Sequence, residues 1–343
     1  MKLGLKITGA VFSALLLSVT AVYAAEPRQN FYRGVNLPQA AFGGQHIPGV
    51  AGRDYLWPTG SDVNLFADMG ASILRIPFLW ERMQPQLDMP FEQHELAQLD
   101  ALVVAAAMRH VTLLLDVHNY GLYRNLMIGS DAVPVTAFTD LWTRLATHYK
   151  DQPFVAFGLM NEPYQHKAEE WAAIAQQAIN AIRKTGANQL ILVPGTRYSG
   201  AYSWMLKDGV LSNAEALVSL TDPADHFIFE VHQYFDTDSS GSHQPCVDED
   251  IGAQRLAAIT AWLRQTGRKG FLGEFGASKD PVCLAALKRT LRYLADNNDV
   301  WYGWSYWAAA AWFGDYMFNI YPPDPRRFPQ VEILKDAMRG FGD

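Results

Sequence analysis

Eight short apolar runs recur along the chain, and segments with helical spacing separate most of them. The runs are Phe31–Leu37, Ser72–Phe78, Val111–His118, Val155–Met160, Leu190–Thr196, Phe227–Tyr234, Gly270–Phe275 and Trp301–Trp307. Most are almost continuously apolar, which is typical of parallel strands covered on both faces rather than of a half-exposed antiparallel sheet. The pattern therefore predicts a parallel sheet, and parallel neighbours require crossover connections.

Apolar residues at three- and four-residue spacing between most of these runs predict the crossover helices. The helical segments are Glu92–Met108, Thr136–Tyr149, Glu169–Lys184, Ala253–Arg264, Leu284–Ala295 and Val331–Met338. Gly186, Gly267 and Gly340 stand where three of these helices should end. Eight strands alternating with helices predict a single-domain (β/α)8 TIM barrel of the α/β class. A doubly wound nucleotide-binding sheet is disfavoured, because residues 34–38 contain no glycine-rich phosphate loop.

Residues 1–24 have the pattern of a secretory signal peptide. Lys2 and Lys6 precede the apolar stretch Val11–Val19, and small residues end the pattern at Ala24. The apolar stretch is shorter than a membrane-spanning helix. We therefore expect residues 25–343 to be secreted, either to the extracellular space or to the periplasm, with no membrane attachment after cleavage.

The charge balance limits the partners. Without the two signal lysines, the chain has 26 basic and 35 acidic residues, a net charge of −9. Basic residues form no cluster larger than a pair such as Arg326 and Arg327. This balance argues against nucleic acid or an anionic membrane as a partner and favours a neutral substrate. We expect the mature domain to be a monomer.

The chain has two cysteines, Cys246 and Cys283. Both lie in the part expected to be exported, where disulfides persist. Neither has the spacing of a metal-binding motif. The sequence therefore favours a disulfide between them over two free thiols.

Polar residues gather where the predicted strands end, and chemistry in such barrels lies at that end. The residues there are Asn36, Arg75, His118, Asn119, Asn161, Glu162, His232, Tyr234, Glu274 and Trp307. Glu162 precedes Pro163, which should end its strand and hold Glu162 in an extended conformation. Glu274 lies between glycines that allow a ligand to approach closely. Two carboxylates on one rim are the residues that a glycosidase needs.

Neighbouring side chains suit this chemistry. An arginine in an apolar strand needs a carboxylate partner, so we expect Arg75 to pair with Glu274. Tyr234 lies two residues after His232, on the same side of the strand, and is expected to hydrogen-bond a carboxylate.

Aromatic residues and histidines suggest sugar contacts. Trp307 is expected to stack on a pyranose ring, with Trp204 and Trp312 as weaker candidates. His118 and the histidine on the Phe227–Tyr234 run are expected to bond sugar hydroxyls or carboxylates. Metal-dependent hydrolases with this barrel usually take two metal-binding histidines from the first strand, and Phe31–Leu37 has none. We therefore expect no metal and no other cofactor.

Six motifs occur in order over nearly the whole mature chain, and together they resemble a glycoside hydrolase of family five. They are RIPF (75–78), DVHNY (116–120), GLMNEP (158–163), EVHQY (230–234), GEFG (273–276) and WSYW (304–307). The stretch 230–243, followed by Cys246, is similar to the secreted endoglucanase subgroup that includes fungal cellulases. A cysteine after His243 in that subgroup also supports the disulfide. Relatives often carry a tryptophan where this chain has Tyr198.

The resemblance implies that Glu162 is the acid/base and Glu274 the nucleophile of a retaining endo-β-1,4-glucanase acting on cellulose and related soluble β-glucans. The predicted substrate contacts are Arg75, His118, Asn161, His232, Tyr234 and Trp307, together with Asn36 and Trp204. An endo-β-1,4-mannanase or a mixed-linkage β-glucanase would use the same two carboxylates. A catalytically silent glycan-binding barrel would have no need of both.

Overall fold

A computed structural model describes residues 31–207 and 209–341. Eight parallel strands close into a barrel in the order β1-β10-β9-β8-β7-β6-β3-β2. They are β1 (Tyr32–Asn36), β2 (Ile73–Phe78), β3 (Thr112–Val117), β6 (Val155–Gly158), β7 (Ile191–Pro194), β8 (Phe227–His232), β9 (Gly270–Glu274) and β10 (Trp301–Tyr306). Every predicted strand is present, so the predicted TIM barrel is confirmed.

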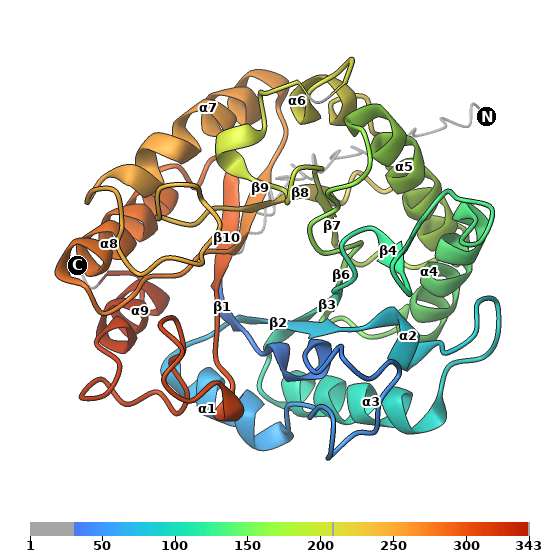
Figure 1. Ribbon diagram of the computed structural model, residues 1–343, viewed down its shortest axis with the longest axis horizontal. Helices are drawn as coiled ribbons and strands as arrows, with labels where there is room; N and C mark the ends of the chain where they lie inside the picture. Colours follow the sequence, from blue (N-terminus) through green and yellow to red (C-terminus); the bar gives the residue numbers. More distant parts are fainter. Residues whose placement is uncertain (1–30, 208, 342–343) are drawn as a thin grey trace, which may run out of the picture. The chain divides into compact units, whose positions relative to one another are not determined.

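Helices form a ring outside the strands (Figure 1). They are α1 (Gly60–Met69), α2 (Trp80–Met83), α3 (Gln93–Met108), α4 (Val135–Tyr149), α5 (Ala168–Lys184), α6 (Asn213–Leu217), α7 (Ile251–Thr266), α8 (Pro281–Asp296) and α9 (Gln330–Met338), with 3-10 turns η1 (Pro38–Ala41), η2 (Ala201–Ser203) and η3 (Ala311–Phe313). All six predicted helices are present. The crossover helix α1 was missed, although a reciprocal cap between Thr59 and Asp62 marks its start.

Two apolar clusters support the barrel. The larger cluster fills the space between strands and helices. The smaller one comes from the strands themselves and consists of Ile73, Leu114, Ala156, Leu190, Leu192, Ile228 and Phe271. Side chains two residues apart on a strand share a face. The polar residues Arg75, Asp116 and Glu230 therefore lie one step above this apolar floor, toward the C-terminal ends of the strands.

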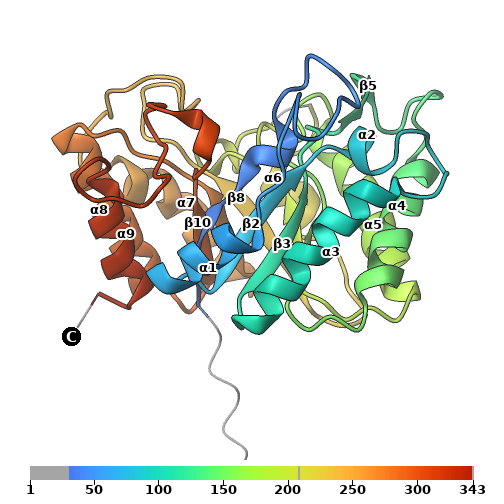
Figure 2. The same ribbon diagram turned by 90° about the horizontal axis from the view of Figure 1, so that it is seen from below.

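Long loops gather at that end of the barrel (Figure 2). The loop after β3 carries the antiparallel pair β4 (Leu122–Tyr123) and β5 (Leu126–Met127). The predicted disulfide is present: Cys246, in the loop after β8, is bonded to Cys283 of α8. In the segments 31–207 and 209–341, no helix is long and apolar enough to cross a membrane. The predicted signal peptide, residues 1–24, lies outside the described residues.

Replacing both Cys246 and Cys283 by alanine should destabilise the fold. The crosslink spans a sequence separation of 37 residues. On the chain-entropy account a loop of that length contributes about 3 to 4 kcal/mol. Urea unfolding of the variant and of the oxidised wild type measures the difference. Equal midpoints, or two thiols titrating in the unreduced, denatured wild type, would contradict the prediction.

Candidate active site

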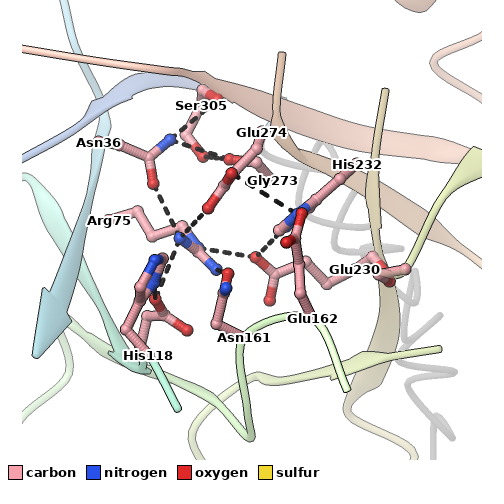
Figure 3. A network of polar contacts seen from close by, with 12 residues as sticks. Asn36, Arg75, His118, Asn161, Glu162, Glu230, His232, Gly273, Glu274 and Ser305 are labelled. Atoms are coloured by element: carbon pink, nitrogen blue, oxygen red, sulfur yellow. Dashed lines mark hydrogen bonds and ion pairs between the residues drawn. The ribbon is translucent and has the colours of Figure 1, made fainter. Parts of the chain in front are cut away.

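Arg75 lies fully buried at the centre of a polar network on top of the barrel floor (Figure 3). Its Nε donates to Glu230 Oε1 at 2.7 Å and its Nη1 to Glu274 Oε1 at 2.9 Å. Asp116 Oδ2 lies 3.0 Å from Nη1. Burial alone would lower the pKa of Arg75, but these three carboxylates outweigh burial and raise it above its ordinary value. The predicted pair of Arg75 and Glu274 is therefore present, as part of a larger cluster.

Two amides complete the arginine's surroundings. Asn36 Oδ1 and Asn161 Oδ1 accept from Arg75 at 3.0 and 2.9 Å. Asn36 Nδ2 donates to the backbone oxygens of Gly273 and Ser305. Asn36 and Arg75 are fully buried and fix the strand ends beneath the cleft. Their contact with substrate stays a prediction. Asn161 Nδ2 has no hydrogen-bond partner among the described residues.

Glu274, the last residue of β9, accepts a hydrogen bond on each carboxyl oxygen. Arg75 donates to Oε1, and the Tyr234 hydroxyl donates to Oε2 at 2.9 Å. Burial raises the pKa of Tyr234 well above its ordinary value, so this phenol remains a neutral donor. Burial also raises the pKa of Glu274, while His232 and Arg75 offset part of that effect. The two donors favour the ionised form of Glu274, because a carboxylate is the better acceptor.

Glu162 lies across the mouth of the barrel from Glu274, and His232 contacts both carboxylates. His232 Nδ1 lies 2.7 Å from Glu162 Oε1, and one ligand atom from each of the three residues lies within 4.8 Å of the others. Burial would lower the pKa of His232, but the charge of Glu274 and the hydrogen bonds to Glu162 and Glu230 raise it to about 10. Such a triad resembles a metal site, yet this imidazolium and Arg75 already supply positive charge and oppose a further cation.

The backbone at Glu162 differs from the prediction. Strand β6 ends at Gly158, and Glu162 adopts the left-handed conformation, with φ 45°, rather than an extended one. Hydrogen bonds hold the chain on both sides, from Asn161 N to Val117 O and from Tyr198 N to Pro163 O. These tethers override the local preference, at a conformational cost of about 1–3 kcal/mol. Backbone strain of this kind is common at functional sites.

His118 and Trp307 form one wall. His118 Nδ1 lies 2.7 Å from Asp116 Oδ2, which orients the ring. The imidazole lies parallel to the Trp307 indole, with 5.6 Å between ring centroids. Both residues line the cleft, as does Trp312, which is 40% exposed.

Trp204 does not belong to the site, so its predicted role in substrate binding is wrong. The side chain is fully buried and packs against Phe229 of β8 and Trp262 of α7. Trp204 follows a strand in the sequence, but its position there does not reveal that its ring points outward, into the layer between strands and helices.

The carboxylates open into a cleft of about 510 Å³ on one side and a hollow of about 260 Å³ on the other. The cleft is lined by Phe42, His118, Tyr120, Glu162, Tyr234, Ser240, Gly241, Glu274, Trp307, Trp312, Phe313 and Tyr316. The hollow is lined by Glu162, Tyr198, Gly200, Tyr202, His232, Tyr234, Asp238, Ser239 and Ser240. The two share Glu162, Tyr234 and Ser240, so they adjoin at the acid, and together they are called the groove. This geometry suits a long, neutral, many-hydroxyl ligand.

The sequence interpretation missed Asp116 and Glu230. Each precedes a predicted site histidine by two residues, Asp116 before His118 and Glu230 before His232. The same spacing had already placed Tyr234 beside His232. The same two-residue rule, applied toward the N-terminal side of each histidine, would have identified Asp116 and Glu230.

Comparison with known proteins gives consistent matches. The family model of Cellulase (glycosyl hydrolase family 5) matches residues 33–310. Endo-beta-1,4-glucanase B of Aspergillus niger is 38% identical over 307 residues, 89% of this chain and 89% of that protein. A triple mutant of an endo-beta-1,4-glucanase from Xanthomonas axonopodis pv. citri is 46% identical, with a TM-score of 0.87, over 90% of this chain and 99% of that one. Pseudomonas stutzeri endoglucanase Cel5A in complex with cellobiose is 35% identical, with a TM-score of 0.82, over 90% and 92%.

Replacing Arg75 by methionine should cost about 3–5 kcal/mol of folding stability, because it leaves three buried carboxylates without their cation. Arg264→Met is the matched control. It breaks an ion pair to Asp299 in which both side chains are about half exposed, and solvent screens such pairs so that they contribute little. Chemical denaturation of both variants gives the two losses. Similar losses would show that the buried network does not stabilise the barrel.

Proposed function

Because the chain belongs to the cellulase family, glycosyl hydrolase family 5, we propose that it is an endo-β-1,4-glucanase that cleaves internal bonds of cellulose-type chains. One observation carries this proposal. One carboxyl oxygen each of Glu162 and Glu274 and one ring nitrogen of His232 lie within 4.8 Å of one another, in a groove that extends to both sides of Glu162. A separation near 5 Å suits double displacement and leaves no room for the water that an inverting enzyme places between its carboxylates.

In the proposed mechanism, Glu274 attacks the anomeric carbon while Glu162 gives its proton to the leaving oxygen. Arg75 and Tyr234 hold Glu274 in place and stabilise its negative charge before attack. The first step ends with a sugar covalently bound to Glu274. Glu162, now ionised, removes a proton from water, which frees the sugar and restores both residues.

The sugar next to the bond would contact side chains at the groove floor and walls. We assign this role to His118, His232, Tyr234 and Trp307, which line the groove, and to Asn161, whose Nδ2 has no partner in the described part of the chain. Trp307 lies beside the parallel ring of His118, and both rings line the cleft. Arg75 and Asn36 support the site from below.

The proposed partner is a β-1,4-glucan, and the complex of the Pseudomonas stutzeri relative with cellobiose supports it. We further propose that residues 1–24 are a signal peptide and that the mature domain is secreted as a monomer. The Cys246–Cys283 disulfide supports export. The acidic charge balance supports a partner that is neither nucleic acid nor membrane.

A hydrolysis panel tests the substrate. Soluble cellulose derivatives should be cleaved fastest, mixed-linkage glucan next, and mannan and xylan least. Product release is measured as reducing ends at equal substrate mass. Preference for mannan would indicate an endo-β-1,4-mannanase with the same carboxylate pair. Absence of cleavage on every glycan would indicate a glycan-binding protein without this activity.

Hydrolysis should retain the anomeric configuration. Two successive displacements at one carbon return the β-anomer first, because each inverts the centre once. Proton NMR of cello-oligosaccharide digestion, recorded before mutarotation, identifies the first-formed anomer. Early α-anomer would mean that Glu162 and Glu274 are not the reacting pair.

Glu162→Ala and Glu274→Ala should fail in different ways. Loss of the nucleophile should abolish turnover of every substrate. Loss of the acid should lower kcat/KM by about 10²–10⁴-fold on cello-oligosaccharides, but far less on an aryl cellobioside whose leaving group needs no proton. Comparing kcat/KM on the two substrates, with circular dichroism as the folding control, separates the roles. Equal loss on both substrates in Glu162→Ala would contradict the assignment of the acid.

A further inference from the structure

Glu230 of β8 is a fully buried carboxylate to which the proposed mechanism gives no task. Its Oε1 accepts from Arg75 Nε at 2.7 Å and lies 3.4 Å from His232 Nε2. Its Oε2 has no hydrogen-bond partner among the described residues. A buried charge is costly unless it is well compensated. Because Glu230 lies beneath the two reacting carboxylates, packing alone does not account for a charged residue at this position.

The neighbouring strand β9 leaves space for this carboxylate. A Cβ on Gly273 of β9 would lie 2.3 Å from Glu230 Oε1. Any side chain at Gly273 would therefore displace Glu230. Glu230 thereby reaches both Arg75 and His232 (Figure 3).

His232 lies between two carboxylates, with Nδ1 toward Glu162 and Nε2 toward Glu230. Ionised carboxylates offer only acceptors, so both ring nitrogens must carry hydrogen when both acids are ionised. Glu230 therefore favours the imidazolium from the side facing away from the cleft. On the cleft side, the same imidazolium directs its Nδ1–H at the proposed acid/base.

We propose that Glu230 is a positioning residue that keeps a proton in the His232–Glu162 pair and holds the Arg75 guanidinium in place beneath Glu274. The inference deepens the proposed function and rests on the roles given there to Glu162 and Glu274. Glu230 touches neither the cleft nor the reacting atoms. It acts on them through one histidine and one arginine.

The charge of Glu230 acts within a wider set of groups. The titratable and charged residues that surround the His232–Glu162 pair are Arg75 of β2, Asp116 of β3, His118 and Tyr120 after β3, Tyr198 after β7, Glu274 of β9 and Tyr234 after β8. Glu230→Gln keeps the volume and removes one negative charge from this set. The pair should then lose its proton at lower pH, since a nearby negative charge favours the protonated imidazole.

Nitrogen-15 NMR of labelled histidine tests this without any substrate. The chain has nine histidines, and His232→Gln identifies the resonance. In the wild type, His232 should remain an imidazolium at neutral pH. In Glu230→Gln its titration should move down by about 1 pH unit or more. Glu230→Asp, which keeps the charge, should stay closer to the wild type than Glu230→Gln. Glu95→Gln, a buried carboxylate that accepts from Trp57, is the matched control and should change nothing.

A neutral His232 beside an ionised Glu162 in the wild type at pH 7 would overturn the proposal even if Glu230→Gln failed to fold. An unchanged titration in a folded Glu230→Gln would also overturn it.

The pH profile of kcat/KM on cello-oligosaccharides gives the second readout. In Glu230→Gln the basic limb of the profile should move to lower pH, because Glu162 then loses its catalytic proton at lower pH. A merely structural role would lower the rate and leave the limb in place, which would also refute the inference. Because the NMR arm needs no turnover, failure of the proposed glucanase activity would be seen separately from failure of this assignment.

Discussion

The buried charge of Arg75 is the constraint on which the top of this barrel depends. A guanidinium cannot be neutralised at any ordinary pH, so its surroundings must supply acceptors in fixed directions. Asp116, Glu230 and Glu274 supply them from β3, β8 and β9. One cation thereby ties together strands that lie far apart in the sequence. Stability and chemistry are coupled here, since the same contacts that compensate the charge also aim the proposed nucleophile.

Much of the fold and the reacting pair could be predicted from the sequence, for physical reasons that apply locally. A parallel strand covered on both faces must be apolar along its length, so each strand was visible as a short run. An acid at the end of such a run indicates that this strand end faces a ligand. Glu162 and Glu274 are both of this kind, and their convergence follows from closure of the barrel.

What could not be predicted depends on depth and on backbone direction. A residue at a strand end can face the cleft, as Trp307 does, or lie beneath it, as Asn36 does, and residue type alone does not separate the two. Trp204 turns outward because Phe229 and Trp262 offer it a place. The left-handed turn at Glu162 contradicts the local rule for a residue before proline. Hydrogen bonds to Val117 of β3 and from Tyr198, in the loop after β7, impose it, and such tertiary contacts leave no mark in the adjacent sequence.

The groove that passes over Glu162 has a consequence for polymer solutions. A site bounded at one end selects chain termini, whereas hollows on both sides of the acid admit a chain anywhere along its length. Under the proposed activity, each cut then falls at an interior position and divides a long molecule into two shorter ones. Average chain length drops steeply with the first few bonds broken. A cellulose solution should therefore thin long before an appreciable amount of soluble sugar accumulates.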